Sequence, residues 1–85
     1  MTYYVYMLKN IDRLKSKTYV GFTNNLDKRL NLHNNNKGAK STKGYKWIVI
    51  YKKRFINKSK ALSYEYTLKK NRKLRNQIFN KFRKF

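Results

Sequence analysis

The sequence has no cysteine, no proline, three glycines and three acidic residues in 85 positions. Without cysteine the chain forms neither disulfides nor a thiolate zinc site, which excludes a zinc finger. No run is long and apolar enough for a signal peptide or a membrane span, so we expect an intracellular protein with no membrane partner. No proline or Gly/Ser-rich linker marks a boundary, so we expect one domain over residues 1–85.

The scarcity of acids gives the chain a very unequal charge. Twenty-three Lys and Arg face three acids, for a net charge of +20 at pH 7. Such self-repulsion weakens a compact state, so a polyanionic partner is expected, and nucleic acid is the usual one. An AT-rich genome would add Lys but would not remove acids, so the depletion of acids favours nucleic-acid binding. The location should follow the DNA: nucleus in a eukaryote, cytoplasm in a bacterium or a cytoplasmic virus.

The hydrophobic pattern predicts a small α+β domain (α/β in the broad sense). Aromatic and β-branched residues predict strands at 3–8 and 18–22, close enough in sequence to form an antiparallel hairpin. Residues 47–51 are a continuous apolar run, typical of a strand buried on both faces, and the strand should extend to Phe55. Residues 10–17 and 40–46 are polar and predict loops.

Helical spacing and Asn residues place the helices. Thr23, Asn24 and Asn25 supply candidate caps for a helix at about 25–35, and Asn57 or Ser59 can cap one at about 59–70. A basic third helix follows at about 71–85. Its apolar stripe is formed by Leu74, Ile78, Phe82 and Phe85. The predicted order is β-β-α-β-α-α, a mainly antiparallel three-stranded sheet flanked by helices.

Three polar residues are candidates for chemistry. Glu65 lies on or beside the apolar face of its helix, where a carboxylate needs a metal, several donors or a cation. A structural salt bridge to one of the many Lys or Arg residues explains it equally well. Arg29 and His33 are four residues apart and emerge on one helix face. They could bind phosphate and transfer protons, or His33 could be an ordinary polar surface residue.

Tyrosine and glycine in the first two strands add weaker signals. Tyr6 and Tyr19 fall on strands expected to pair, but with eight tyrosines in the chain each one could simply be packing. Gly21, inside the second strand, is typical of a bulge or of the close approach of another backbone.

The order and spacing of these residues resemble the GIY-YIG nuclease superfamily. Tyr4-Val5-Tyr6 and Tyr19-Val20-Gly21 are similar to its two signature tripeptides, with Tyr in place of the first Gly. The arginine, histidine and glutamate of that family correspond to Arg29, His33 and Glu65. Residues 19–25, 32–34 and 37–40 are most similar to the catalytic subunit of SLX structure-selective endonucleases and to small stand-alone UvrC-like proteins. A late asparagine of UvrC-type members would fall at Gln77 and is not assigned.

The resemblance implies a metal-dependent endonuclease for branched, flapped or single-stranded DNA, acting in repair or recombination. Glu65 would hold Mg²⁺ or Mn²⁺, and Arg29 would neutralise phosphoryl charge. Tyr19 or Tyr6, with His33 assisting, would deprotonate or orient the attacking water, and nearby positive charge would lower the phenol pKa from about 10. DNA-backbone contacts, with little sequence readout, are expected from Lys37, Lys40, Lys43, Lys46, Lys69, Lys70 and Arg72.

Two alternatives stay open. One is a non-catalytic module that binds DNA or RNA and keeps the fold and the charge. The other is an RNA-directed member of the family, or an RNA-binding protein of ribosomal type. The zinc-binding domain of the SLX subunit is absent, so no protein partner can be identified.

Overall fold

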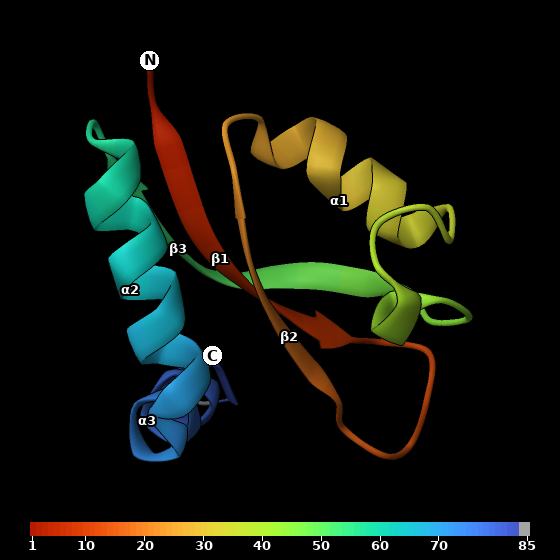
Figure 1. The fold of residues 1–85 in the computed structure, drawn as a ribbon. Coiled ribbons are helices and arrows are strands. Elements are labelled where there is room, and N and C mark those ends of the chain that lie inside the picture. Colours follow the sequence, from red (N-terminus) through yellow and green to blue (C-terminus); the bar gives the residue numbers. More distant parts are fainter. Residues whose placement is uncertain (84–85) are drawn as a thin grey trace.

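Residues 1–83, which the computed structural model describes, fold into three strands, three α-helices and one short 3-10 helix (Figure 1). In chain order they are β1 (Tyr3–Asn10), β2 (Thr18–Thr23), α1 (Leu26–Asn34), η1 (Lys40–Thr42), β3 (Trp47–Phe55), α2 (Lys58–Lys70) and α3 (Arg72–Arg83). The predicted class and order are confirmed. The addition is η1, which lies in a segment predicted to be a loop.

The strand at the centre of the sheet is β1. It pairs antiparallel with β2 on one side and with β3 on the other, in the order β2-β1-β3. The prediction that residues 47–51 are buried on both faces is therefore wrong, because β3 is an edge strand and most of it is only half-buried. The segment that is buried on both faces is residues 5–8 of β1, where each residue is at most 1% exposed.

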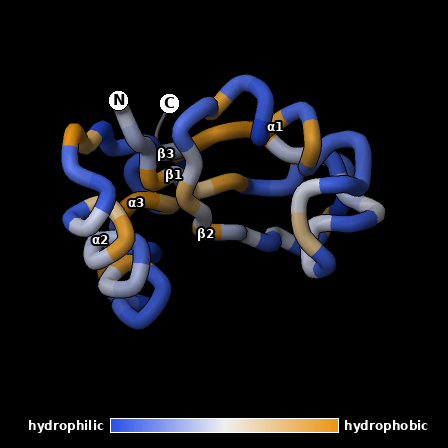
Figure 2. The backbone as a smooth tube through the Cα atoms, turned by 45° about the horizontal axis from the view of Figure 1, so that its top comes forward, coloured by the Kyte–Doolittle hydropathy of each residue, from blue (hydrophilic) through white to orange (hydrophobic). Residues whose placement is uncertain are grey.

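Alternate residues of β1 pack against different layers, because successive strand side chains point to opposite faces. Val5 and Met7 join a core with Ala61 and Leu68 of α2. Tyr6 and Leu8 join a second core, whose other members are Trp47, Tyr19, Leu26, Leu30, Tyr45 and Val49. The sheet thus has α2 and α3 on one face and α1 on the other. Figure 2 shows the hydrophobic residues gathered along the strands between these layers.

The helices begin where asparagine can cap them. Asn25 Oδ1 accepts from the Lys28 backbone N–H at 3.1 Å, and Asn57 Oδ1 accepts from that of Lys60 at 3.1 Å, so both predicted caps are confirmed. On α3, Leu74 and Ile78 of the predicted stripe pack against the first core. Phe85 and the predicted end of this helix lie outside the described residues. None of the described helices is long and apolar enough to cross a membrane.

Asn34, near the end of α1, fastens the helix to the open edge of β3. Its side-chain oxygen accepts from the Trp47 backbone N–H at 2.6 Å, and its amide nitrogen donates to the Trp47 carbonyl at 3.2 Å. One side chain therefore satisfies both backbone groups of an edge-strand residue, which would otherwise need water or another strand. This contact holds the end of α1, and with it His33, against the sheet.

We expect Asn34→Ala to destabilise the fold by about 1–3 kcal/mol, because partly buried backbone groups of Trp47 lose their partners. Urea unfolding followed by the fluorescence of Trp47, the single tryptophan, measures the change. Asn31→Ala, at an exposed position of the same helix, is the matched control and should change stability little. Equal unfolding free energies for the two variants would contradict the fastening role.

Candidate active site

Tyr6 is buried because Gly21 leaves room for its ring. The two residues are cross-strand partners in β1 and β2. A Cβ atom on Gly21 would lie 2.3 Å from the phenol oxygen of Tyr6. The close approach predicted at Gly21 is therefore real, but it is made by a side chain and not by a backbone. The irregularity in register lies elsewhere, between Met7 and Leu8 in the pairing with β3.

His33 is fully buried and is hydrogen-bonded through both ring nitrogens. Its Nε2 lies 2.9 Å from the hydroxyl oxygen of Tyr6, and its Nδ1 lies 3.0 Å from Oγ1 of Thr42. Gly38 packs flat against the ring, since a Cβ there would lie 2.3 Å from Nδ1. The interpretation of His33 as a polar surface residue is wrong: the residue is 0% exposed and lies at the centre of the contact between α1 and the sheet.

Tyr19 completes an aromatic cluster with these two residues. Its ring centroid lies 4.9 Å from that of His33 and 6.4 Å from that of Tyr6. Tyr19 is half-buried, whereas Tyr6 is 1% exposed. Of the two tyrosines of the signature strands, Tyr19 is thus the one that solvent reaches more easily.

Arg29, one helical turn before His33, places its charge on the same cluster. Its Nε is buried and has no hydrogen-bond partner among the described residues. Its guanidinium acts on the pKa of Tyr6 and of His33. A buried donor without a partner is costly, and a guanidinium fits the oxygens of a phosphate.

Burial controls the protonation of the Tyr6–His33 pair. It raises the pKa of Tyr6 to about 12, although hydrogen bonding and charge from Arg29 act in the opposite direction. Burial and then the charge of Arg29 lower the pKa of His33 below its usual 6.5. The expectation that nearby positive charge lowers the tyrosine pKa is therefore wrong for Tyr6, where desolvation outweighs it. At neutral pH the two rings form a neutral pair.

Glu65 approaches this cluster from α2, which packs over β1 and β2. Its negative charge contributes to the raised pKa of Tyr6, so the carboxylate lies within electrostatic range of the phenol. The side chain is 19% exposed and its Oε2 lies 3.4 Å from Nζ of Lys69. The salt bridge that the sequence analysis gave as an alternative is therefore present.

The donor set for a metal is one carboxylate. No group of three or more His, Asp or Glu side chains gathers within residues 1–83. Mg²⁺ commonly binds through one or two carboxylates, with waters and substrate phosphates as its remaining ligands. A single partly exposed Glu65 fits a metal ion that is held jointly by protein and phosphate.

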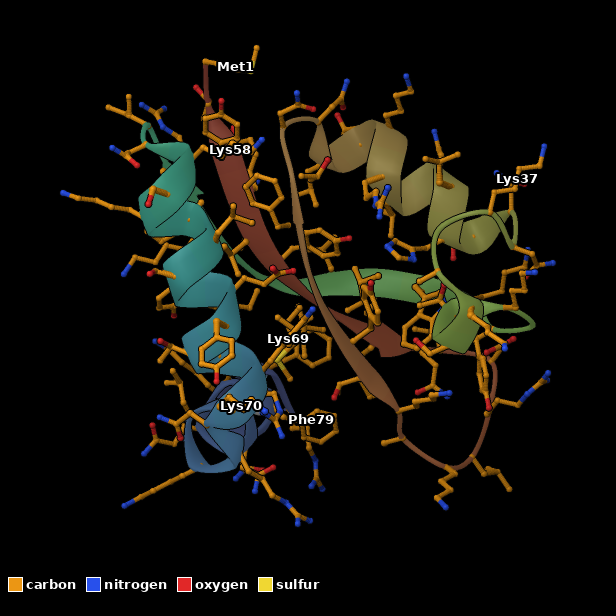
Figure 3. The ribbon with its side chains drawn as sticks, viewed as in Figure 1. Met1, Lys37, Lys58, Lys69, Lys70 and Phe79 are labelled. Carbon is orange, nitrogen blue, oxygen red and sulfur yellow. The ribbon has the colours of Figure 1, made fainter. Side chains whose placement is uncertain are left out.

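The predicted DNA-backbone residues are all exposed, but they form two groups. Lys37, Lys40, Lys43 and Lys46 follow α1, and Lys69, Lys70 and Arg72 lie at the junction of α2 and α3. Figure 3 shows the labelled Lys37 beyond the end of α1, and Lys69 and Lys70 at the far end of α2. Of the five catalytic candidates, the structure brings Tyr6, Tyr19, Arg29 and His33 together, and Glu65 lies within electrostatic range of Tyr6.

Sequence reasoning missed Thr42. It is 0% exposed, it contacts His33 through its hydroxyl, and its carbonyl accepts from Nε1 of Trp47 at 3.0 Å. In the sequence it is one hydroxyl residue among the lysines of a polar loop. The one available signal was its position shortly after His33, in a segment that must fold back onto the sheet.

Comparison with known proteins identifies the family to which the chain belongs. Residues 2–80 match the family described as the GIY-YIG catalytic domain. A UPF0213 protein of Oceanobacillus iheyensis is 47% identical over 68 residues, which are 79% of this chain and 76% of the relative. The uncharacterized protein L300 of Acanthamoeba polyphaga mimivirus is 43% identical over 76 residues, 84% of this chain and 45% of the viral protein.

A solved structure shares the fold. The solution NMR structure of a UPF0213 protein from Bacillus halodurans superposes with a TM-score of 0.53 at 31% sequence identity. The alignment covers 94% of this chain and 84% of the other. The Oceanobacillus and Bacillus relatives are UPF0213 proteins, where the sequence suggested SLX-type and UvrC-like proteins.

We expect His33 to titrate below pH 6.5, and Arg29→Gln to raise its pKa by removing a nearby positive charge. Since His33 is the only histidine, NMR titration of its ring protons reports it without ambiguity. Lys28→Gln, the exposed neighbouring position, removes the same charge and is the matched control.

The lowered pKa of His33 also makes the stability of the fold depend on pH. Because the unfolded chain binds the proton more readily, the unfolding free energy should be level above about pH 6.5 and fall as the pH drops toward the folded-state pKa. A His33 pKa at or above 6.5, unaffected by Arg29→Gln, would contradict the electrostatic description of the site.

Proposed function

The chain belongs to the GIY-YIG family, and we propose that it is a metal-dependent endonuclease that hydrolyses phosphodiester bonds in branched, flapped or single-stranded DNA. The observation that carries this proposal is the grouping of Tyr6, Tyr19, Arg29 and His33 in one cluster within electrostatic range of Glu65. A protein that only binds DNA gains nothing from placing one of its three acids beside a cationic site.

Arg29 is the phosphate-binding residue in this proposal. Its buried Nε has no partner among the described residues, and a phosphoryl oxygen would supply one. As charge develops on the phosphoryl oxygens in the transition state, a guanidinium already in place stabilises it without reorganisation. The two groups of cations would bind the flanking backbone, with little dependence on sequence.

Glu65 would hold the Mg²⁺ or Mn²⁺ ion. A metal bound there would act as a Lewis acid on a phosphate oxygen, which is the chemistry that neutral tyrosines cannot supply. The Glu65–Lys69 ion pair is exposed on the lysine side, so Lys69 can turn to the DNA backbone when a metal takes its place. Replacing the Lys69 ammonium group by a metal ion at Glu65 would change the stability of the fold little.

Tyr19 is the tyrosine that contacts the attacking water in this proposal. It is partly exposed and packs on His33, whereas the hydroxyl of Tyr6 is buried and bonded to His33. Tyr19 would orient the attacking water through its phenol oxygen and, in its phenolate form, would accept the proton of that water. Tyr6 and His33 would then hold the cluster in shape.

The choice of branched substrates rests on the similarity of residues 19–25, 32–34 and 37–40 to SLX-type endonucleases. Two separated groups of cations suit a substrate with more than one arm, because each group can bind a different backbone segment. A role in repair or recombination follows from such substrates.

The test is cleavage of labelled junction, flap, splayed and single-stranded substrates, in DNA and matched RNA versions, with Mg²⁺ or Mn²⁺. We expect Glu65→Gln to reduce the cleavage rate by about a thousandfold, because Lewis-acid stabilisation by a bound metal is worth several kcal/mol. Binding should survive, since it depends on the cations. Tyr19→Phe should behave similarly.

Asp27→Asn is the matched control, because Asp27 is an exposed acid on α1 and its loss changes the net charge by the same amount. Equal rates for wild type and Glu65→Gln would rule out the proposed metal role. Salt-sensitive binding with no product under any divalent metal would favour the non-catalytic module, for which the Glu65–Lys69 ion pair is the supporting observation. Preferential cutting of RNA would identify an RNA-directed member.

A further inference from the structure

The buried hydroxyl of Thr42 has three polar neighbours but can donate only one hydrogen bond. Its Oγ1 lies 3.0 Å from the Ala39 carbonyl oxygen, 3.2 Å from the Ala39 backbone nitrogen and 3.0 Å from Nδ1 of His33. The Ala39 N–H can only donate and the Ala39 carbonyl can only accept. The partner whose role is open is His33, which carries its proton on Nδ1 or on Nε2.

One assignment of protons satisfies all three contacts. If Thr42 donates to the Ala39 carbonyl, Oγ1 accepts from both the Ala39 N–H and an Nδ1–H of His33. If Thr42 instead donates to Nδ1, two oxygens with no proton between them face each other at 3.0 Å. In a fully buried site an unfavourable contact of this kind has no water to relieve it. The surroundings of Thr42 therefore favour His33 with its proton on Nδ1.

The other side of the ring leads independently to the same tautomer. With Nδ1 protonated, Nε2 is an acceptor and Tyr6 must donate its hydroxyl proton to it at 2.9 Å. The reverse assignment would leave the buried Tyr6 proton in need of another acceptor. Among the described residues His33 is the hydrogen-bond partner of the phenol, and Arg29, whose charge acts on Tyr6, carries donors and no acceptor.

We propose that Thr42 is a positioning residue that fixes His33 with its proton on Nδ1, so that Tyr6 donates to Nε2 and presents only lone pairs to Arg29. This deepens the proposed nuclease function and rests on it for its catalytic consequence. The hydrogen-bonded chain runs from Ala39 in the loop through Thr42 and His33 to Tyr6. The charge of Arg29 acts on Tyr6, so the proposed effect is to hold the phenol oxygen as an acceptor for the guanidinium that would meet the phosphate.

The tautomer can be read directly in the intact protein. In a protein labelled with ¹⁵N, the two ring nitrogens of the only histidine differ in chemical shift according to which one carries the proton. We expect the Nδ1–H tautomer in wild type at a pH where the ring is neutral. A wild-type spectrum with the Nε2–H tautomer overturns the proposal, whether or not the protein cleaves anything.

Two substitutions separate positioning from packing. Thr42→Val keeps the shape and removes the hydroxyl, so we expect a mixture of tautomers or the Nε2–H form. Thr42→Ser keeps the hydroxyl and should retain the wild-type tautomer. Ser41→Ala, at the exposed neighbouring position, is the control. If Thr42→Val is folded and has the same tautomer as wild type, Thr42 does not set it; if this variant does not fold, the wild-type and Thr42→Ser spectra still decide.

The catalytic consequence is measured with the same proteins. We expect Thr42→Val to lower kcat for cleavage by about 10–100-fold, the usual cost of losing a group that orients a catalytic residue, and Thr42→Ser to restore it. A normal kcat in a folded Thr42→Val protein with an altered tautomer would overturn the link to Arg29. Absence of cleavage by wild type would count against the proposed function, while the spectra would still test the tautomer.

Discussion

The site depends on one hydrogen bond, between the Tyr6 hydroxyl in the central strand and Nε2 of His33 on the helix that covers it. Both rings are buried, so water cannot replace either partner, and breaking the bond leaves a polar group unsatisfied. The neighbouring residues are arranged around this pair. Gly21 and Gly38 each lack the Cβ atom that would meet one of the two rings. Thr42 closes the far side of the imidazole, and Asn34 holds the same end of α1 to β3.

Around this neutral pair the chain carries a net charge of +20. Burial keeps the tyrosine protonated and the imidazole uncharged, so the centre of the site adds no charge to a surface that already repels itself. Bound nucleic acid would relieve that repulsion, and counterion release would favour binding. Among so many cations, Glu65 is the one acid whose charge reaches the pair. The contrast between a basic surface and a single acid at the site is what separates a nuclease from a module that only binds.

Local patterns predicted the elements and the antiparallel hairpin of β1 and β2, but they did not predict which strand is central. The strands and the Asn-capped helices follow from runs of neighbouring residues, so their order was available from the sequence. Which strand lies in the centre of the sheet depends on pairing across the whole chain. The apolar run at 47–51 is typical of a central strand, although β3 is an edge strand. The family motif indicated five candidate residues but not their surroundings. His33 meets Tyr6 across 27 positions and Thr42 across nine, and neither separation leaves a periodic signal. The raised pKa of Tyr6 follows from that burial, which composition does not reveal.

The central claim is that this small basic domain is a nuclease and not only a nucleic-acid-binding protein. The most direct measurement is time-resolved cleavage of a labelled branched DNA by the purified wild-type protein, with Mg²⁺, with Mn²⁺ and with a chelator, at a salt concentration where binding is verified in parallel. The proposed mechanism predicts product that accumulates over several turnovers with either metal and none with the chelator. DNA that stays bound and intact with both metals, in every branch geometry offered, would contradict it.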